Sequence, residues 1–241
     1  MNRLEAFEQL RRMGTAVFRT GEAAAVLQEV DSTAHSTLAV LAQHGLIVPL
    51  RYGWWVLPAA GHVDAGSLAP HIAAPYAGYV SFETALFRHG WITQIPPRVT
   101  VATLGRSRRI PTNVGTFELR RIPPDVFGPG EVEPERPWLA MPEKAAFDWA
   151  YQAARGGFES ARFPEIDPTD EADAAALGAF IANIPETRRR ITTARILRER
   201  MALPVNGDIT VAPAGQRARN LPDPNAIAID DIEVETFSGQ L

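Results

Sequence analysis

The segment FRTGEAAAVLQEVDSTAHSTLAVLAQHGLIVPLRYGWWVL, residues 18–57, decides the fold of the first part of this chain. Its alanine-rich start predicts a short helix over 21–28. A second helix is predicted to begin at Asp31 or Ser32, because either side chain can accept a hydrogen bond from a free amide of the first turn. It ends before Gly45, since glycine readily takes the left-handed conformation that closes a helix.

A β-hairpin is predicted directly after the second helix. Residues 46–50 form one strand, Arg51-Tyr52-Gly53 the turn, and Trp54–Leu57 the returning strand. Gly53 supplies the positive φ that such a tight turn requires. With an amphipathic helix over 4–13 in front, this order is that of a winged helix-turn-helix, a fold that holds a recognition helix in the major groove of DNA.

The second helix divides into two faces when it is read at 100° per residue. Its apolar residues fall on one side, small hydrogen-bonding residues fall on the other, and His35 lies near the boundary. Polar side chains near the helix N-terminus suit contacts to bases or phosphates, and the wing tip suits the backbone or the minor groove. The candidate DNA-binding residues are Ser32, Thr33, His35, Ser36, Gln43, Arg51 and Tyr52.

The distribution of charge weakens the DNA interpretation. The whole chain has a formal net charge of -4, and residues 1–60 hold as many acidic side chains as arginines. DNA-binding domains usually show a basic excess, because neutralisation of phosphates supplies most of the sequence-independent affinity. The strongest basic segment is 98–121, which suits added phosphate contacts, an acidic partner or a solvated sheet edge.

Composition excludes several other classes of protein. The chain has 241 residues, enough for two domains, and no apolar run long enough to span a membrane. Its start is charged and amphipathic rather than typical of a signal peptide, so we expect a cytoplasmic protein. It has no cysteine, and its 5 histidines show no paired ligand spacing. We therefore expect no metal, no cofactor and no enzymatic activity.

The remainder predicts a second, mixed unit. A helix is expected over 81–89, strands over 98–104 and 115–122 with a basic loop between them, a short buried strand at 138–140, and a helix over 142–155. Two further helices, 170–184 and 185–200, read as a helical hairpin. The fold class is therefore α+β, organised as a winged helix-turn-helix (1–60), a linker (61–66) and a mixed domain (67–241) that ends in an extended arm or tail (202–241).

The predicted helix over 142–155 holds the chain's only lysine. Lys144 stands alone among 24 basic residues, and a retained lysine suggests a site that a guanidinium cannot serve. Glu143 suits the first turn of the helix, and Asp148 lies four residues after Lys144, within ion-pairing reach. The three residues have two open interpretations: ordinary helix-start chemistry with one ion pair, or a functional surface.

Several blocks of the second unit resemble the AbiEi family of antitoxins, which belong to type IV toxin–antitoxin systems. The first block is YVSFETAL with the following His89-Gly90, and the next two are the strand pair VTVAT (99–103) and GTFELRRI (115–122). The block LAMPEKAAFD (139–148) is similar to the family's Ala-x-Pro-Glu-Lys-Ala-x-x-Asp signature and contains Lys144. The resemblance covers about residues 15–155. Phe82 and Phe87 depart from it, and the tail after Leu203 has no match.

The resemblance implies a DNA-binding repressor of its own operon that binds inverted repeats. It also implies an antitoxin that opposes a nucleotidyltransferase-like toxin without a stable complex, with Glu143, Lys144 and Asp148 as the candidate neutralisation surface. One alternative is a protein-interaction module whose winged helix no longer binds DNA. Another is a DNA-tethered nuclease, which the spacing of the acidic residues disfavours.

Overall fold

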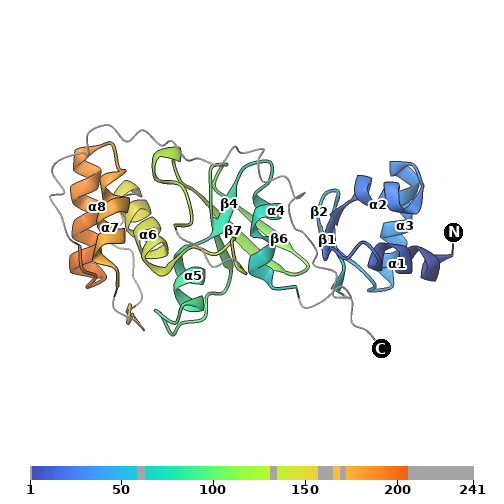
Figure 1. The fold of residues 1–241 in the computed structure, drawn as a ribbon, viewed down its shortest axis with the longest axis horizontal. Coiled ribbons are helices and arrows are strands. Elements are labelled where there is room, and N and C mark those ends of the chain that lie inside the picture. Colours follow the sequence, from blue (N-terminus) through green and yellow to red (C-terminus); the bar gives the residue numbers. More distant parts are fainter. Residues whose placement is uncertain (1, 59–62, 131–134, 157–164, 169–171, 206–241) are drawn as a thin grey trace, which may run out of the picture.

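The computed structural model describes residues 2–58, 63–130, 135–156, 165–168 and 172–205 (Figure 1). Their helices and two β-sheets confirm the predicted α+β class. The molecule is elongated: α1, α2 and α3 lie at one end, the four-stranded sheet in the middle, and α6, α7 and α8 at the other end. No helix in the described part of the chain is long and apolar enough to cross a membrane.

The N-terminal unit, residues 2–57, combines helices with a small antiparallel sheet. Its elements are α1 (Arg3–Arg11), β1 (Val17–Arg19), α2 (Thr20–Leu27), α3 (Asp31–Gln43), β2 (Val48–Arg51) and β3 (Trp54–Val56). The sheet order is β1-β3-β2, with β3 antiparallel to both neighbours. The predicted helices and hairpin are confirmed, whereas β1 was not expected, because only three residues before α2 carry it.

The predicted cap of α3 is wrong by one residue. The helix already includes Asp31, and Val30 occupies the N-cap position without a side-chain hydrogen bond. Asp31 instead places its carboxylate in the first turn, where the helix dipole favours negative charge. Gly45 and Gly53 have φ of 70° and 73°, as their predicted roles in ending the helix and turning the hairpin require.

The C-terminal unit, residues 63–205 as described, begins with a short helical segment and a sheet. Its elements are η2 (Ala65–Leu68), α4 (Ala69–Ala73), β4 (Gly78–Val80), α5 (Phe82–Arg88), β5 (Val99–Thr103), β6 (Arg108–Thr112), β7 (Gly115–Arg121), η3 (Pro124–Val126), α6 (Pro142–Gly156), α7 (Ala174–Ala182) and α8 (Thr187–Arg200). The sheet order is β4-β5-β7-β6. The pair β5–β7 is parallel and the other two pairs are antiparallel.

Two expectations for this unit need correction. The basic segment expected as a loop contains β6, an edge strand whose polar composition and Pro111 hide its strand character. The strand expected at 138–140 is only an isolated bridge between Val80 and Leu139. Helices α7 and α8 pack against α6, in agreement with the predicted hairpin. The predicted linker lies partly outside the described residues, and the tail lies outside them from residue 206 onward.

Strand β3 contributes side chains to the hydrophobic cores of both units. Trp54 and Val56 belong to the large core of the C-terminal unit, whereas Trp55 and the following Leu57 belong to the core of the N-terminal unit. This division follows from the alternation of side chains along a strand. The two units therefore pack through one face of the small sheet, and the β2–β3 hairpin lies at this junction.

Candidate nucleic-acid interface and a buried polar network

Helix α3 has the two faces that its sequence predicts. Ala34, Leu38 and Leu41 are buried against the N-terminal core. The opposite face is exposed and carries all five candidate residues of this helix. These are Ser32, Thr33, His35, Ser36 and Gln43. The structure thus presents a row of short polar side chains to solvent, with the apolar side fixed by packing.

The polar residues of α3 differ in how free their side chains are. Ser36 Oγ donates to the carbonyl of Ser32 at 3.0 Å, so its hydroxyl proton is used inside the helix. The ring of His35 lies 5.8 Å from that of Trp55, tilted by 60°. Among the described residues, the side chains of Ser32, Thr33 and Gln43 make no hydrogen bond. These three side chains are available to a ligand.

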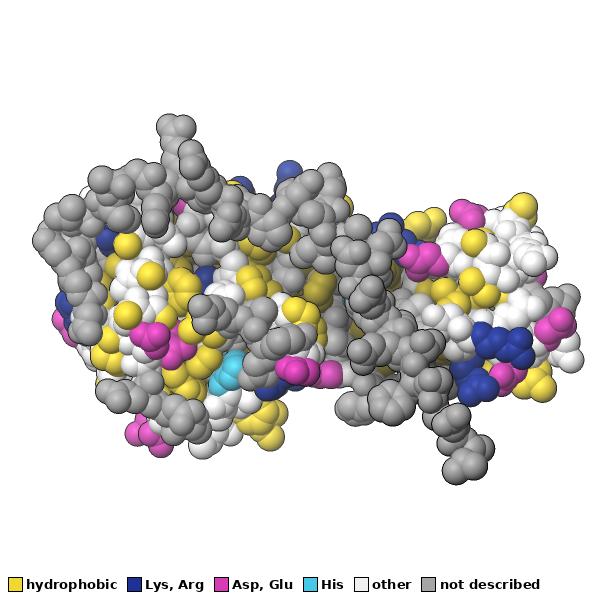
Figure 2. All heavy atoms as spheres, viewed as in Figure 1, with side chains coloured by type: hydrophobic (Ala, Val, Ile, Leu, Met, Phe, Trp, Pro, Cys, Tyr) yellow, Lys and Arg dark blue, Asp and Glu magenta, His cyan; other side chains and the backbone are white. Residues whose placement is uncertain are grey.

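Thr37 and Glu29 fix the start of α3. Thr37 Oγ1 donates to Glu29 Oε2 at 3.0 Å, which ties the helix to the turn that precedes it. The angle between α2 and α3 is thereby held by a side-chain contact as well as by packing. Positive and negative side chains are interspersed on the viewed face of this unit (Figure 2).

The turn between β2 and β3 holds two candidate DNA-binding residues, of which one is exposed to solvent and the other points toward the protein. Tyr52 is 98% exposed at the tip. Arg51 instead points toward the C-terminal unit, where its Nη1 donates to the carbonyls of His71, Ile72 and Ala74 at 3.1, 3.2 and 2.8 Å. Burial lowers the pKa of Arg51, and the nearby guanidiniums of Arg108 and Arg19 lower it further. Arg51 therefore lies in a position that the sequence did not indicate.

The basic segment of the C-terminal unit divides into paired and exposed arginines. Arg98 and Arg120 bind Glu118 at 3.1 Å each, and Arg120 also binds Glu83 at 3.0 Å. Burial raises the pKa of Glu118, but the charges and hydrogen bonds of Arg120 and Arg98 outweigh it, so the net shift is downward. The exposed arginines of the segment are Arg106, Arg108, Arg109 and Arg121, of which Arg109 also forms an ion pair with Glu118 at 3.9 Å.

The edge strands of the two sheets, β2 and β6, lie beside each other. β2 contacts β6, and Asn113 Nδ2 donates to the carbonyl of Pro49 at 3.4 Å. A shallow, open groove lies between them, lined by Pro49, Leu50, Arg51, Pro111, Thr112 and Asn113. Strand β6 therefore lies beside the β2–β3 hairpin, and Arg108 is an electrostatic neighbour of Arg51.

Lys144 lies at the centre of a buried network in the C-terminal unit. Its Nζ donates to Asp148 Oδ1, to Tyr79 Oη at 3.0 Å and to the carbonyl of Val126 at 2.9 Å. Asp148 Oδ2 accepts from Tyr79 Oη at 2.9 Å and from Ser81 Oγ at 2.7 Å. All three ammonium protons thus have an acceptor, which is what a buried charge requires.

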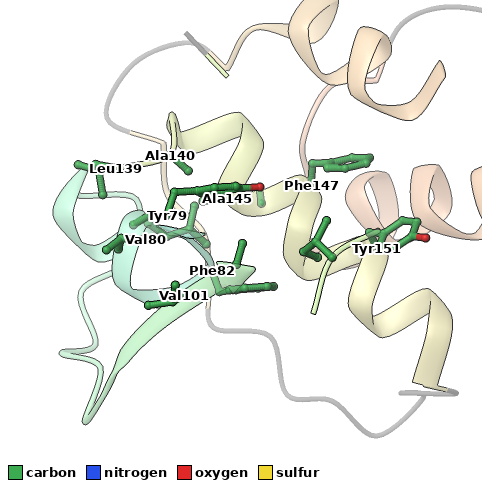
Figure 3. Close-up of a cluster of buried hydrophobic side chains, with 14 of the residues drawn as sticks. Tyr79, Val80, Phe82, Val101, Leu139, Ala140, Ala145, Phe147 and Tyr151 are labelled. Carbon is green, nitrogen blue, oxygen red and sulfur yellow. The ribbon is translucent and has the colours of Figure 1, made fainter. Parts of the chain in front are cut away.

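The surroundings of this network are apolar. Lys144 Nζ lies 4.9 Å from the ring centre of Phe147 and 5.6 Å from that of Tyr79. Figure 3 shows these rings among the side chains of β4, α5 and α6. Burial lowers the pKa of Lys144 and raises the pKa of Asp148, and their ion pair opposes both shifts. Burial and the charge of Asp148 raise the pKa of Tyr79 well above its usual value.

The candidate neutralisation surface is not a surface in this structure. Glu143, Lys144 and Asp148 are 6%, 2% and 0% exposed. The predicted ion pair between Lys144 and Asp148 is confirmed. Glu143 Oε1 accepts from the backbone N–H of Asp173 at 3.0 Å and so holds the start of α7. The interior location has a physical cause: all three side chains lie on the sides of α6 that face the sheet and α7.

Sequence reasoning missed the partners that these residues meet. Tyr79 and Ser81 were noted in the sequence only as members of the block YVSFETAL, yet both hydroxyls bind Asp148. The available signal was the coincidence of one lysine, one i+4 carboxylate and a preceding polar pair, Tyr79 and Ser81. No group of three or more potential metal ligands occurs within the residues that the structure describes.

No model of a known protein family matches this chain, and no curated protein matches it significantly.

Proposed function

We propose that this chain is a DNA-binding transcriptional repressor whose N-terminal unit is a winged helix-turn-helix. The observation that carries the proposal is the exposed face of α3, where Ser32, Thr33 and Gln43 hold hydrogen-bonding groups without partners among the described residues. Short polar side chains of this kind can bind base edges and phosphates in the major groove. The element order from α1 to β3 supports the same class.

Affinity for the phosphate backbone would come from outside α3. The N-terminal unit itself is balanced in charge, and Arg11 is bound to Glu8 at 2.9 Å. The exposed arginines of β6 and of the turn before it lie beside the wing, where they could neutralise phosphates flanking the recognition site. The DNA-binding surface proposed here thus uses both units.

We also propose, from the sequence resemblance to AbiEi antitoxins, that the protein opposes a nucleotidyltransferase-like toxin encoded with it. The buried network supports a structural role for the family-like signature around Lys144 rather than a contact surface. Co-expression with a candidate toxin gene from the same operon tests this half, with growth of the host as the readout. Continued growth arrest despite expression of this chain would contradict it.

A protection assay on the DNA upstream of the gene tests the repressor half. We expect a discrete footprint over an inverted repeat that weakens as salt increases. Thr33→Glu should abolish it, because a carboxylate at the start of α3 would face phosphates. Thr187→Glu is the matched control, since it places the same change at an exposed helix start at the far end of the molecule.

The alternative class is a protein-interaction module that retains the fold without binding DNA. The balanced charge of the N-terminal unit favours it. Equal protection of any duplex, or none, would support this alternative. A footprint that Thr33→Glu removes and Thr187→Glu preserves would exclude it.

A further inference from the structure

We propose that Arg51 is a positioning residue that fastens the wing to the C-terminal unit, and that it affects DNA binding through the orientation of α3 rather than through a phosphate. This inference rests on the proposed function. It assigns to Arg51 a role opposite to the one that its place in the hairpin turn suggests.

The guanidinium of Arg51 points to the end of α4. Nη1 donates to three carbonyls, those of His71, Ile72 and Ala74, at the end of α4. The last carbonyls of a helix have no partner within it and carry the negative end of the helix dipole. A cation at this position satisfies them, so Arg51 completes α4 from a different unit of the protein.

The charges around Arg51 are positive. Its electrostatic neighbours are Arg108 and Arg19, and it forms no ion pair with a carboxylate among the described residues. Like charges at this site would favour a guanidinium that turns outward into water. The side chain nevertheless stays inward, which shows that the carbonyls of α4 and the packing around them outweigh the repulsion.

Residues on both sides of the turn also pack against the C-terminal unit. Leu50 and Trp54 flank it in sequence, and both belong to the core of the C-terminal unit. The ring of Trp54 lies 5.0 Å from that of His71, and the guanidinium of Arg19 lies 4.5 Å from its centre. Arg51 and Trp54 therefore both contact His71 of α4, one at its carbonyl and the other at its ring. Together they resist rotation of the small sheet.

The consequence for DNA binding is geometric. An Arg51 that turned toward a phosphate would leave three carbonyls without their donor. Held inward, it fixes β2 beside β6 and so sets the position of the exposed arginines relative to α3. Orientation of two contact surfaces changes affinity without changing the number of phosphates that are neutralised.

A distance measurement in the full chain tests the positioning role without DNA. The chain has no cysteine, so Ala25→Cys in α2 and Ala179→Cys in α7, both exposed, provide a unique pair of spin-label sites. We expect a narrow distribution of label distances in the parent protein and a broader one after Arg51→Ala. An unchanged distribution would overturn the proposal.

A salt titration tests how Arg51 affects binding to DNA. The probe is a duplex spanning the footprint on the upstream DNA. We expect Arg51→Ala to weaken binding by about tenfold with an unchanged slope of log affinity against log salt. A slope reduced by about one would show a lost phosphate contact and overturn the proposal.

Arg51→Lys separates the two roles if Arg51→Ala folds poorly. A phosphate contact tolerates lysine, whereas the shorter ammonium does not reproduce the reach of a guanidinium to all three carbonyls. We expect Arg51→Lys to weaken binding as well, and full binding by this variant would count against the positioning role. If the parent protein binds no duplex, the proposed function fails, and the distance measurement alone decides the role of Arg51.

Discussion

Arg51 and Lys144 are two cations that the sequence placed among the candidate functional residues, and both are turned inward. Lys144 is 2% exposed and shares its charge with Asp148. Arg51 is only partly buried and binds carbonyls alone. The comparison shows two ways to hold a cation inside a protein: a paired charge within one unit, and an unpaired charge at the end of a helix between two units.

Removal of the Lys144 ammonium and removal of the Arg51 guanidinium should have different effects on the protein. Removing one member of a buried ion pair leaves an uncompensated charge in a low-dielectric interior. Removing a cation from a helix end leaves carbonyls that water can reach, because the site is partly open. We therefore expect Lys144 to matter mainly for stability and Arg51 mainly for the relation between the units.

The largest expected effect is that of Lys144→Met. The loss of the ammonium leaves Asp148 buried without its counter-charge, so we expect a decrease of about 3–5 kcal/mol in the free energy of unfolding. Denaturant unfolding of the full chain measures it. Arg155→Met, at an exposed site on the same helix, should change stability by less than about 0.5 kcal/mol. Equal decreases in the free energy of unfolding of Lys144→Met and Arg155→Met would contradict the special role of the buried charge.

A double variant sharpens the origin of that loss. Lys144→Met combined with Asp148→Leu removes both charges, so we expect it to be less destabilised than the sum of the single variants by about 0.5–3 kcal/mol. A thermodynamic cycle from the same unfolding experiments gives this coupling. Strict additivity would mean that Tyr79 and Ser81, rather than the ion pair, account for the cost.

Arg51→Ala should have a smaller effect on stability. Hydrogen bonds from a charged donor contribute about 1.5–3 kcal/mol when they are buried, and partial exposure reduces this. We expect a decrease of about 1–2 kcal/mol, measured by thermal or denaturant unfolding. Arg106→Ala, an exposed arginine beyond the wing, serves as the control and should leave unfolding unchanged. A loss as large as that of Lys144→Met would remove the distinction between the two cations.

The smallest expected effect is a dependence on pH at His71, whose ring lies 5.0 Å from that of Trp54 and is influenced by the charge of Arg19. Burial lowers the pKa of His71 below its usual value of 6.5, and Arg19 lowers it further. The unfolded chain therefore binds more protons than the folded protein in the range below pH 6.5, so stability should fall as pH decreases through that range.

A substitution that keeps the ring tests this assignment. His71→Phe retains an aromatic contact with Trp54 but cannot titrate, so the slope of stability against pH just below 6.5 should become shallower. Unfolding midpoints at several pH values measure it. His44→Phe, a change at an exposed histidine of the N-terminal unit, is the control. A slope that His71→Phe leaves unaltered would assign the pH dependence to other groups.

The sequence predicted the elements that depend on local patterns. The faces of α3, the turn at Gly53, the strands around Val101 and Leu119 and the helix from Pro142 follow from periodicity and from single-residue preferences. Burial of Lys144 was not predictable in this way, because its acceptors Tyr79 and Val126 are 65 and 18 residues away in sequence. Strand β6 was missed because polar edge strands lack an apolar alternation.

The sequence likewise predicted one part of the candidate site, the face of α3, but not the direction of Arg51. Exposure of Ser32, Thr33 and Gln43 follows from the helical period, so the face of α3 was found. The direction of Arg51 depends on where α4 lies, and α4 itself was not expected. A turn residue can be located by its sequence, but the side to which it points is set by the partner that packs there.

The alternation along β3 has a consequence for how such proteins can be rearranged during evolution or by engineering. If the N-terminal unit were separated from the chain after Leu57, it would keep Leu50, Trp54 and Val56. These side chains would then meet water instead of the core that they now line. Joining a different N-terminal unit to this C-terminal unit would in turn remove Arg51, which donates hydrogen bonds to the carbonyls at the end of α4. The packing of each unit therefore depends on the other, and exchange of the N-terminal unit requires exchange of the surface beneath it.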